Sequence, residues 1–133
     1  IYKKKYIKYY MNKETIEKLF NVESFLVLGL IIFNILNLIL FSKDSQALLV
    51  NSLILLCAYF GISKRHDKKV VLLSIIHFAF YGVIFESLII KHSKLLTYRD
   101  PHSSLNIPLW LFPIYCSFAL GALHTYEIFK GVD

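Results

Sequence analysis

Glu86 is the residue of this sequence whose type and position most directly indicate chemistry. It lies in the apolar run 69–90, four residues before the run ends and so roughly 6 Å below the end of a helix. A carboxyl group at that depth costs less than one at the bilayer centre and can act as a general acid or base. We predict a shallow pocket with Glu86 as a catalytic candidate and Tyr98, Arg99 and Trp110 as ligand-binding residues. The alternative is that Glu86 only anchors the helix, by reaching water or by pairing with Lys91 or Lys94.

His77 is the second catalytic candidate. In a helix, Ser74, His77 and Tyr81 would share one face, because residues three and four apart are neighbours on a helix surface. An ionisable group inside an apolar helix indicates a ligand, a proton relay or a substrate contact, and Tyr81 would then add a ligand-binding hydroxyl. The alternative is a structural hydrogen bond between helices.

Further polar residues are expected to form a polar seam through the interior of a helical bundle. Asn34 and Asn37 are three residues apart, and the rise of a helix puts Asn51 within about 3 Å of the depth of Asn37. By the same arithmetic, His124 lies roughly 6 Å deeper than His77. The seam could serve as an ion or proton path. Its simpler interpretation is interhelical hydrogen bonding worth about 0.6–2 kcal/mol per pair.

No cofactor is predicted. His124 and Glu127 could place two metal ligands on one side of a helix, but this His-x-x-Glu spacing occurs once and few other buried acids accompany it. Haem would need two histidines at matching depth, whereas His77 and His124 differ in depth. The sequence therefore disfavours both haem and a metal, and it contains no P-loop, GxSxG, HExxH or CxxC motif.

The elements that must position these residues are four long apolar segments. They span residues 24–41, 45–62, 69–90 and 107–129, and each has about the 20 residues that a helix needs to cross a bilayer core. The 133-residue chain is 56% hydrophobic and 18% charged, with a mean hydropathy of +0.56. These features predict an all-α integral membrane bundle of four transmembrane helices (24–133), preceded by a basic amphipathic segment (1–23) with a short helix after Asn12.

Basic residues are distributed unequally between the two predicted sides of the membrane. Eleven lie in the N-terminal segment, in the loop around 63–69 and at Lys130, against four at the other side. By the positive-inside rule we expect a multi-pass protein with both termini in the cytoplasm, or in the matrix if the membrane is organellar. The net charge of +6 then indicates anionic lipid headgroups as partners of the N-terminus, and nucleic acid is not expected.

Residues 85–115 combine Glu86 with "YRDP" and "IPLWLFPIY". In this segment, about a quarter of the chain, the sequence resembles a group of small, functionally uncharacterised polytopic membrane proteins of bacteria and large DNA viruses. A similar Glu…Tyr…Pro-Leu layout occurs in membrane-bound carotenoid hydratases. The sequence departs from the pattern at Leu96, where an aromatic residue is expected, and at Tyr115, where a second Trp is expected. The resemblance implies a shared helix–loop–helix and a pocket, and it transfers no activity.

Three functions remain open on the sequence. The first is an accessory or assembly subunit of a larger membrane complex, in contact with other subunits or with copies of itself. The second is a lipid- or isoprenoid-binding protein or enzyme with its pocket around Glu86. The third is an ion or proton pathway through His77, Asn34 and Asn37.

Overall fold

The computed structural model describes residues 13–93 and 107–130, which form five α-helices and contain no strand. A short helix, α2, precedes four long ones, α3 to α6. Their bounds are α2 Lys13–Leu19, α3 Val22–Leu40, α4 Ser45–Ile62, α5 Lys68–Ser93 and α6 Leu111–Phe129. The all-helical class is therefore confirmed, and so is a short helix after Asn12.

Side chains at the N-termini define where α3 and α4 begin. The Asn21 side chain accepts a hydrogen bond from the Ser24 amide at 2.9 Å, and the Asp44 side chain accepts one from the Ala47 amide at 3.1 Å. Each of these caps satisfies an amide that has no partner inside its helix. Only residues 41–44 separate α3 from α4, so the two helices run antiparallel as neighbours.

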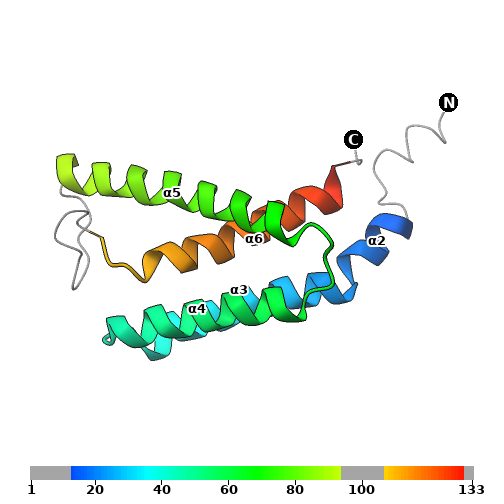
Figure 1. Cartoon of the computed structure of the whole chain (residues 1–133), viewed down its shortest axis with the longest axis horizontal. Coiled ribbons are helices and arrows are strands. Elements are labelled where there is room, and N and C mark those ends of the chain that lie inside the picture. The colour runs from blue at the N-terminus through cyan, green and yellow to red at the C-terminus, as the bar shows by residue number, and fades with distance from the viewer. Residues whose placement is uncertain (1–12, 94–106, 131–133) are drawn as a thin grey trace, which may run out of the picture.

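Helix α6 is the centre of the arrangement. It packs against α5 on one side and against α3 and α4 on the other, and its C-terminal part also contacts α2 (Figure 1). By contrast, α5 packs chiefly on α6 alone. The buried residues of α5 accordingly form one stripe, at Val71, Ile75, Ala79, Val83 and Ile90. Much of the rest of the α5 surface is exposed.

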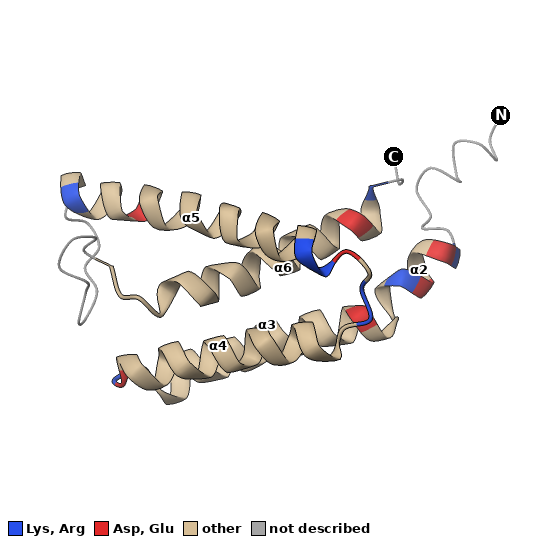
Figure 2. Cartoon of the chain, in the orientation of Figure 1, with Lys and Arg blue, Asp and Glu red and all other residues tan. Residues whose placement is uncertain are grey.

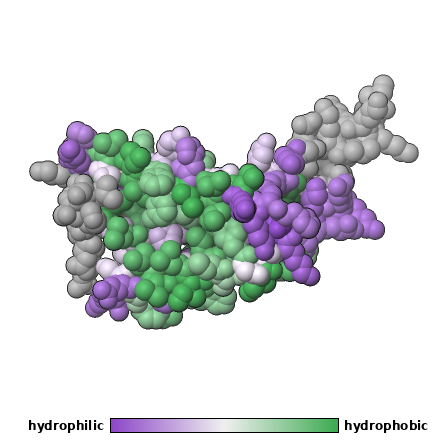
Figure 3. Space-filling model, in the orientation of Figure 1, coloured by the Kyte–Doolittle hydropathy of each residue, from purple (hydrophilic) through white to green (hydrophobic). Residues whose placement is uncertain are grey.

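The surface between the two ends of the bundle is apolar. Large exposed side chains include Phe25, Phe33, Phe78 and Phe85, and Figure 3 shows a hydrophobic belt with hydrophilic residues at both ends. Helices α3, α4 and α5 are each long and apolar enough to cross a membrane. Exposed apolar surface of this extent is not typical of soluble monomers.

Charged side chains gather at the ends of the bundle, and most of them at one end (Figure 2). We call this the basic end: α2, the α4–α5 connection and the C-terminal end of α6. It holds seven of the nine Lys and Arg residues in the described ranges; only Lys43 and Lys91 lie at the opposite end.

Several predicted bounds need correction, and the start of the last helix needs the largest. It was expected at residue 107, but α6 begins at Leu111, after a turn in which the Leu111 amide donates to the Pro108 carbonyl at 3.3 Å. Pro113 therefore lies in the first helical turn, where a missing N–H breaks no hydrogen bond, and it does not loosen the helix as expected. The other shifts are small: α3 covers 22–40 instead of 24–41, and α5 covers 68–93 instead of 69–90.

Candidate functional site

Glu86 is paired with Tyr115 across the α5–α6 interface. The Tyr115 hydroxyl donates a hydrogen bond to Oε2 of the half-buried Glu86. Gly82, one turn earlier on α5, lies against the Tyr115 ring: a Cβ at Gly82 would be 3.6 Å from it, an ordinary van der Waals contact. Tyr115 was not predicted as a site residue. Tyr115 lies five residues after Trp110, so roughly 8 Å further along the axis of α6. That is similar to the depth of roughly 6 Å below the helix end predicted for Glu86.

The other residues predicted around Glu86 are only partly described. Trp110 directly precedes α6, is half-buried and packs against the small apolar cluster of Val83, Ile90, Ile107 and Leu111. Tyr98 and Arg99 lie outside the described residues. The pocket predicted around Glu86 therefore stays a prediction.

The structure does not place His77 in the interior, where polar residues of a bundle were expected. His77 is exposed on the outer face of α5, together with Ser74 and Tyr81. Its ring stacks edge-on against Tyr81, with centroids 4.6 Å apart, and Ser74 donates to the Val70 carbonyl of its own helix. The three residues do share one face as expected. His77 and Tyr81 are exposed on it, and Ser74 borders the groove between α5 and α6.

The asparagines form two separate interior contacts. Asn34, 0% exposed, donates from Nδ2 to Ser117 Oγ on α6 at 3.1 Å. One turn further along α3, Asn51 Nδ2 donates to Asn37 Oδ1 at 3.1 Å. The two asparagines therefore lie at similar depth in the bundle, as the helix rise predicted. Because His77 faces outward, it does not extend this polar seam.

His124 joins the basic end instead. Its Nε2 lies 2.9 Å from Ser24 Oγ, and Ser24 donates its own hydroxyl proton to the Lys18 carbonyl at 2.6 Å. Ser24 can therefore only accept from the ring, so Nε2 carries the proton and Nδ1 has a bare lone pair. This Nδ1 atom is buried and has no hydrogen-bond partner within the described residues.

Glu23 connects α3 to the end of α4. Its carboxylate accepts hydrogen bonds from the Ser63 hydroxyl at 2.8 Å, the Tyr59 hydroxyl at 3.2 Å and the Lys64 amide at 3.0 Å. Three neutral donors thus stabilise the charge where the helices end. Sequence reasoning missed Glu23, although its place at the start of an apolar run was a usable signal.

Arg65 lies beside Glu23 and links the α4–α5 connection to α6. Its guanidinium bonds Glu127 at 2.6 Å and Asp67 at 3.1 Å, and its side chain is only 9% exposed. Burial alone lowers the Arg65 pKa, but the hydrogen bonds to Glu127 and Asp67 outweigh it and raise that pKa overall. The bond from Arg65 in turn lowers the pKa of the Asp67 carboxyl.

These residues surround a cleft at the basic end, with a volume of about 380 Å³. Charged and polar side chains from α2, the α4–α5 connection and α6 line it: Lys18, Asn21, Glu23, Arg65, Asp67, His124, Glu127 and Lys130. We refer to it as the basic-end cleft. Within residues 13–93 and 107–130, no group of three His, Cys, Asp or Glu side chains could hold a metal ion.

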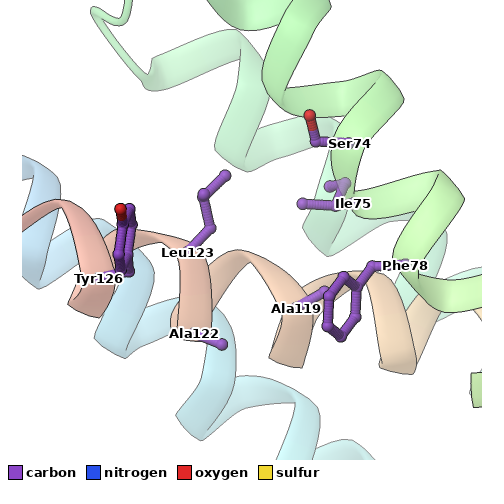
Figure 4. Close-up of a pocket in the computed structure, with 7 residues that line it drawn as sticks. All are labelled: Ser74, Ile75, Phe78, Ala119, Ala122, Leu123 and Tyr126. Carbon is purple, nitrogen blue, oxygen red and sulfur yellow. The ribbon is translucent and has the colours of Figure 1, made fainter.

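A second cavity is an apolar groove between α5 and α6, with a volume of about 240 Å³ (Figure 4). Ser74, Ile75 and Phe78 line it from α5. The α6 side is formed by Ala119, Ala122, Leu123 and Tyr126. Because the alanine side chains are small, a space remains between Phe78 and Tyr126.

Comparisons of the chain with family models, with curated proteins and with solved structures gave no match. The resemblance of residues 85–115 to small polytopic membrane proteins therefore stays a prediction.

Proposed function

We propose that this chain is a multi-pass integral membrane protein and acts as an accessory or assembly subunit of a larger membrane complex. The apolar belt and the three membrane-length helices support the membrane location. The outer face of α5 supports the role of a subunit, and we propose that it is the surface that contacts the partner.

We further propose that α6 crosses the membrane as a fourth span. With 19 residues it is as long as α3, but it carries His124 and Glu127 near its C-terminal end. These two residues lie at the basic end, where they bond to Ser24 and Arg65. Neighbouring helices cover much of the remainder of α6, so its polar atoms need not meet hydrocarbon.

The exposed face of α5 is the observation that carries the proposed role. His77 lies near the middle of this 26-residue helix, with Ser74 and Tyr81 on the same face, and Tyr81 is 61% exposed. Ionisable residues in membrane helices almost always face protein or water, because hydrocarbon offers them no hydrogen bond. A polar helix from a partner subunit would supply the missing hydrogen bonds and cover this face.

The proposal is tested by replacing His77 with leucine and measuring particle size after mild detergent extraction. We expect the unmodified chain to migrate in a particle larger than a lone chain. His77→Leu should weaken this association about 3- to 30-fold, the effect of an interhelical hydrogen bond of about 0.6–2 kcal/mol. Cys57→Leu is the matched control, because Cys57 is exposed on α4, away from the proposed contact.

The same experiment separates the second candidate function, a lipid- or isoprenoid-binding protein. The apolar groove between α5 and α6 favours it, since the groove offers apolar walls and two polar groups, Ser74 and Tyr126. Isolation of the unmodified chain as a monomer with a retained apolar ligand would contradict the subunit role and support this candidate instead.

A further inference from the structure

We propose that the outer face of α5 pairs with the same face of a second copy of this chain, with the His77 and Tyr81 side chains of the two copies hydrogen-bonded across a two-fold axis. This pairing rests on the subunit role proposed above and names the partner of the α5 surface. The two copies lie side by side, with their basic ends on the same side of the membrane.

The buried stripe of α5 directs His77 away from the rest of the bundle. Ile75 and Ala79 are buried and lie two residues before and two residues after His77. Two residues turn a helix by about 200°, so His77 faces almost directly away from α6. Helix α5 lies at the edge of the bundle, as Figure 1 shows. Its outer face consists of the exposed side chains that share this direction: Val70, Leu73, His77, Tyr81, Ile84 and Leu88.

The spacing and charge of the outer face suit a second helix of the same sequence. Val70, His77 and Ile84 recur at intervals of seven residues, a repeat that keeps a row of side chains against a neighbouring helix when the two cross at about 20°. No Asp, Glu, Lys or Arg lies between Lys69 and Glu86. Two copies of this stretch can therefore approach without repulsion between like charges.

A shallow hollow lies beside the outer face and is formed by α5 alone. Its volume is about 430 Å³, and in it Gly82, which has no side chain, lies among four larger residues: Tyr81, Ile84, Phe85 and Leu88. Paired helices pack by inserting side chains of one helix into holes between side chains of the other. The hollow offers such a hole to an apolar side chain of the second α5.

The two polar residues of this face can satisfy each other in a pair of copies. In its neutral form an imidazole donates a hydrogen bond from one nitrogen and accepts one at the other, and a tyrosine hydroxyl does both. Neither His77 nor Tyr81 makes a hydrogen bond to another of the described residues, and their rings pack edge-on with centroids 4.6 Å apart. Each copy therefore presents the donors and the acceptors that the other one needs.

Membrane insertion brings these groups to the same depth. The excess of Lys and Arg at the basic end favours one orientation for every copy, so identical residues of two copies lie level with each other. Side chains of a helix lean toward its N-terminus, which brings the Tyr81 hydroxyl back toward the level of His77. A partner of different sequence would need a polar side chain of its own at this depth, whereas a second copy provides one by symmetry.

Disulfide trapping in native membranes tests the pairing. Val70→Cys places a thiol on the outer face near the basic end, and we expect mild oxidation to link it to the same thiol of a second copy, giving a band of twice the mass on a non-reducing gel. Ile62→Cys is the matched control, because Ile62 is similarly exposed near the basic end but lies on α4. It should give no more dimer than the unmodified chain, whose Cys57 and Cys116 set the background.

Two substitutions at His77, made in the Val70→Cys chain, test the hydrogen bond. His77→Leu should lower the dimer yield at low expression about 3- to 30-fold, the effect of one interhelical hydrogen bond. His77→Asn should keep most of the dimer, because a side-chain amide also both donates and accepts. An unchanged yield in His77→Leu would overturn the pairing, and so would a loss in His77→Asn as large as that in His77→Leu.

The size of the extracted particle separates this pairing from the subunit role. If Val70→Cys gives no more dimer than Ile62→Cys, the pairing is wrong; should the particle still exceed a lone chain, the subunit role stands with a different partner. A lone chain in detergent, together with no trapped dimer, contradicts both proposals. A trapped dimer whose particle contains nothing else supports the pairing and contradicts membership of a larger complex.

Discussion

Arg65 shows how far the environment of one residue can differ from its sequence context. It lies in "SKRHDKK", a segment that reads as a solvated loop, yet its side chain is almost buried. The side chain is buried because its guanidinium bonds Glu127, 62 residues away near the end of α6. Arg65 therefore links the α4–α5 connection to α6, two segments that lie far apart in the sequence.

We predict that Glu127→Gln lowers the free energy of unfolding by about 1–2 kcal/mol, because Arg65 loses one of its two carboxylate partners. The figure is discounted for solvent screening, since Glu127 is 30% exposed. Thermal unfolding in detergent measures it. Glu17→Gln, an exposed carboxylate of α2, is the control and should change nothing. A loss as small as that of the control would show that the Arg65–Glu127 pair does not stabilise the fold.

At the scale of the elements, α6 determines the arrangement. Gly121 allows a close approach to α3: a Cβ built there would lie 2.6 Å from Ile31 Cδ1. The clash is with the end of a flexible side chain, so a small substituent can be accommodated and a branched one cannot. Close packing of this kind replaces the hydrophobic effect as the force between helices in a bilayer.

Gly121→Val should therefore destabilise the protein by about 1–3 kcal/mol, the cost of overpacking a core. Gly121→Ala should have a much smaller effect, because the gain in helix propensity offsets the shift of Ile31. Gly29→Val is the matched control, since a Cβ at Gly29 meets nothing within 4 Å. Unfolding in denaturing detergent reports all three, and equal effects of the two valines would contradict a close α3–α6 contact.

At the scale of the whole molecule, the distribution of charge indicates how the chain is oriented. The basic end holds most of the described lysines and arginines, as the colouring in Figure 2 shows. The opposite end holds Lys43, at the α3–α4 turn, and Lys91, at the end of α5. By the positive-inside rule we predict that the basic end faces the cytoplasm, or the matrix if the membrane is organellar.

A single cysteine in each connection tests this orientation. Lys43→Cys should react with a membrane-impermeant maleimide added to intact cells, whereas Lys64→Cys should react only after the membrane is permeabilised. Both positions are exposed, so access depends on the side of the membrane. The unmodified chain, with Cys57 and Cys116 inside helices, gives the background. The reverse labelling pattern would show that the orientation is inverted.

The sequence by itself determined the helical class, the number of long helices and most of their bounds. Runs of about 20 apolar residues leave the backbone only one way to satisfy its hydrogen bonds in a bilayer, so α4 at 45–62 could be predicted to the residue. The start of α6 was misplaced by four residues, because Pro108 and Pro113 both fit a first helical turn and only the fold shows which one is in it.

Tertiary structure alone decided which faces meet. The long helices are apolar nearly all round, so no amphipathic stripe shows which side of α5 is buried and which side carries His77. It also decided the partners of the polar atoms. Ser24 and His124 are 100 residues apart, and the contact between them forms because α3 and α6 pack together. Which distant residues pair depends on how the helices pack against one another. The spacing of residues within one helix does not indicate these pairs.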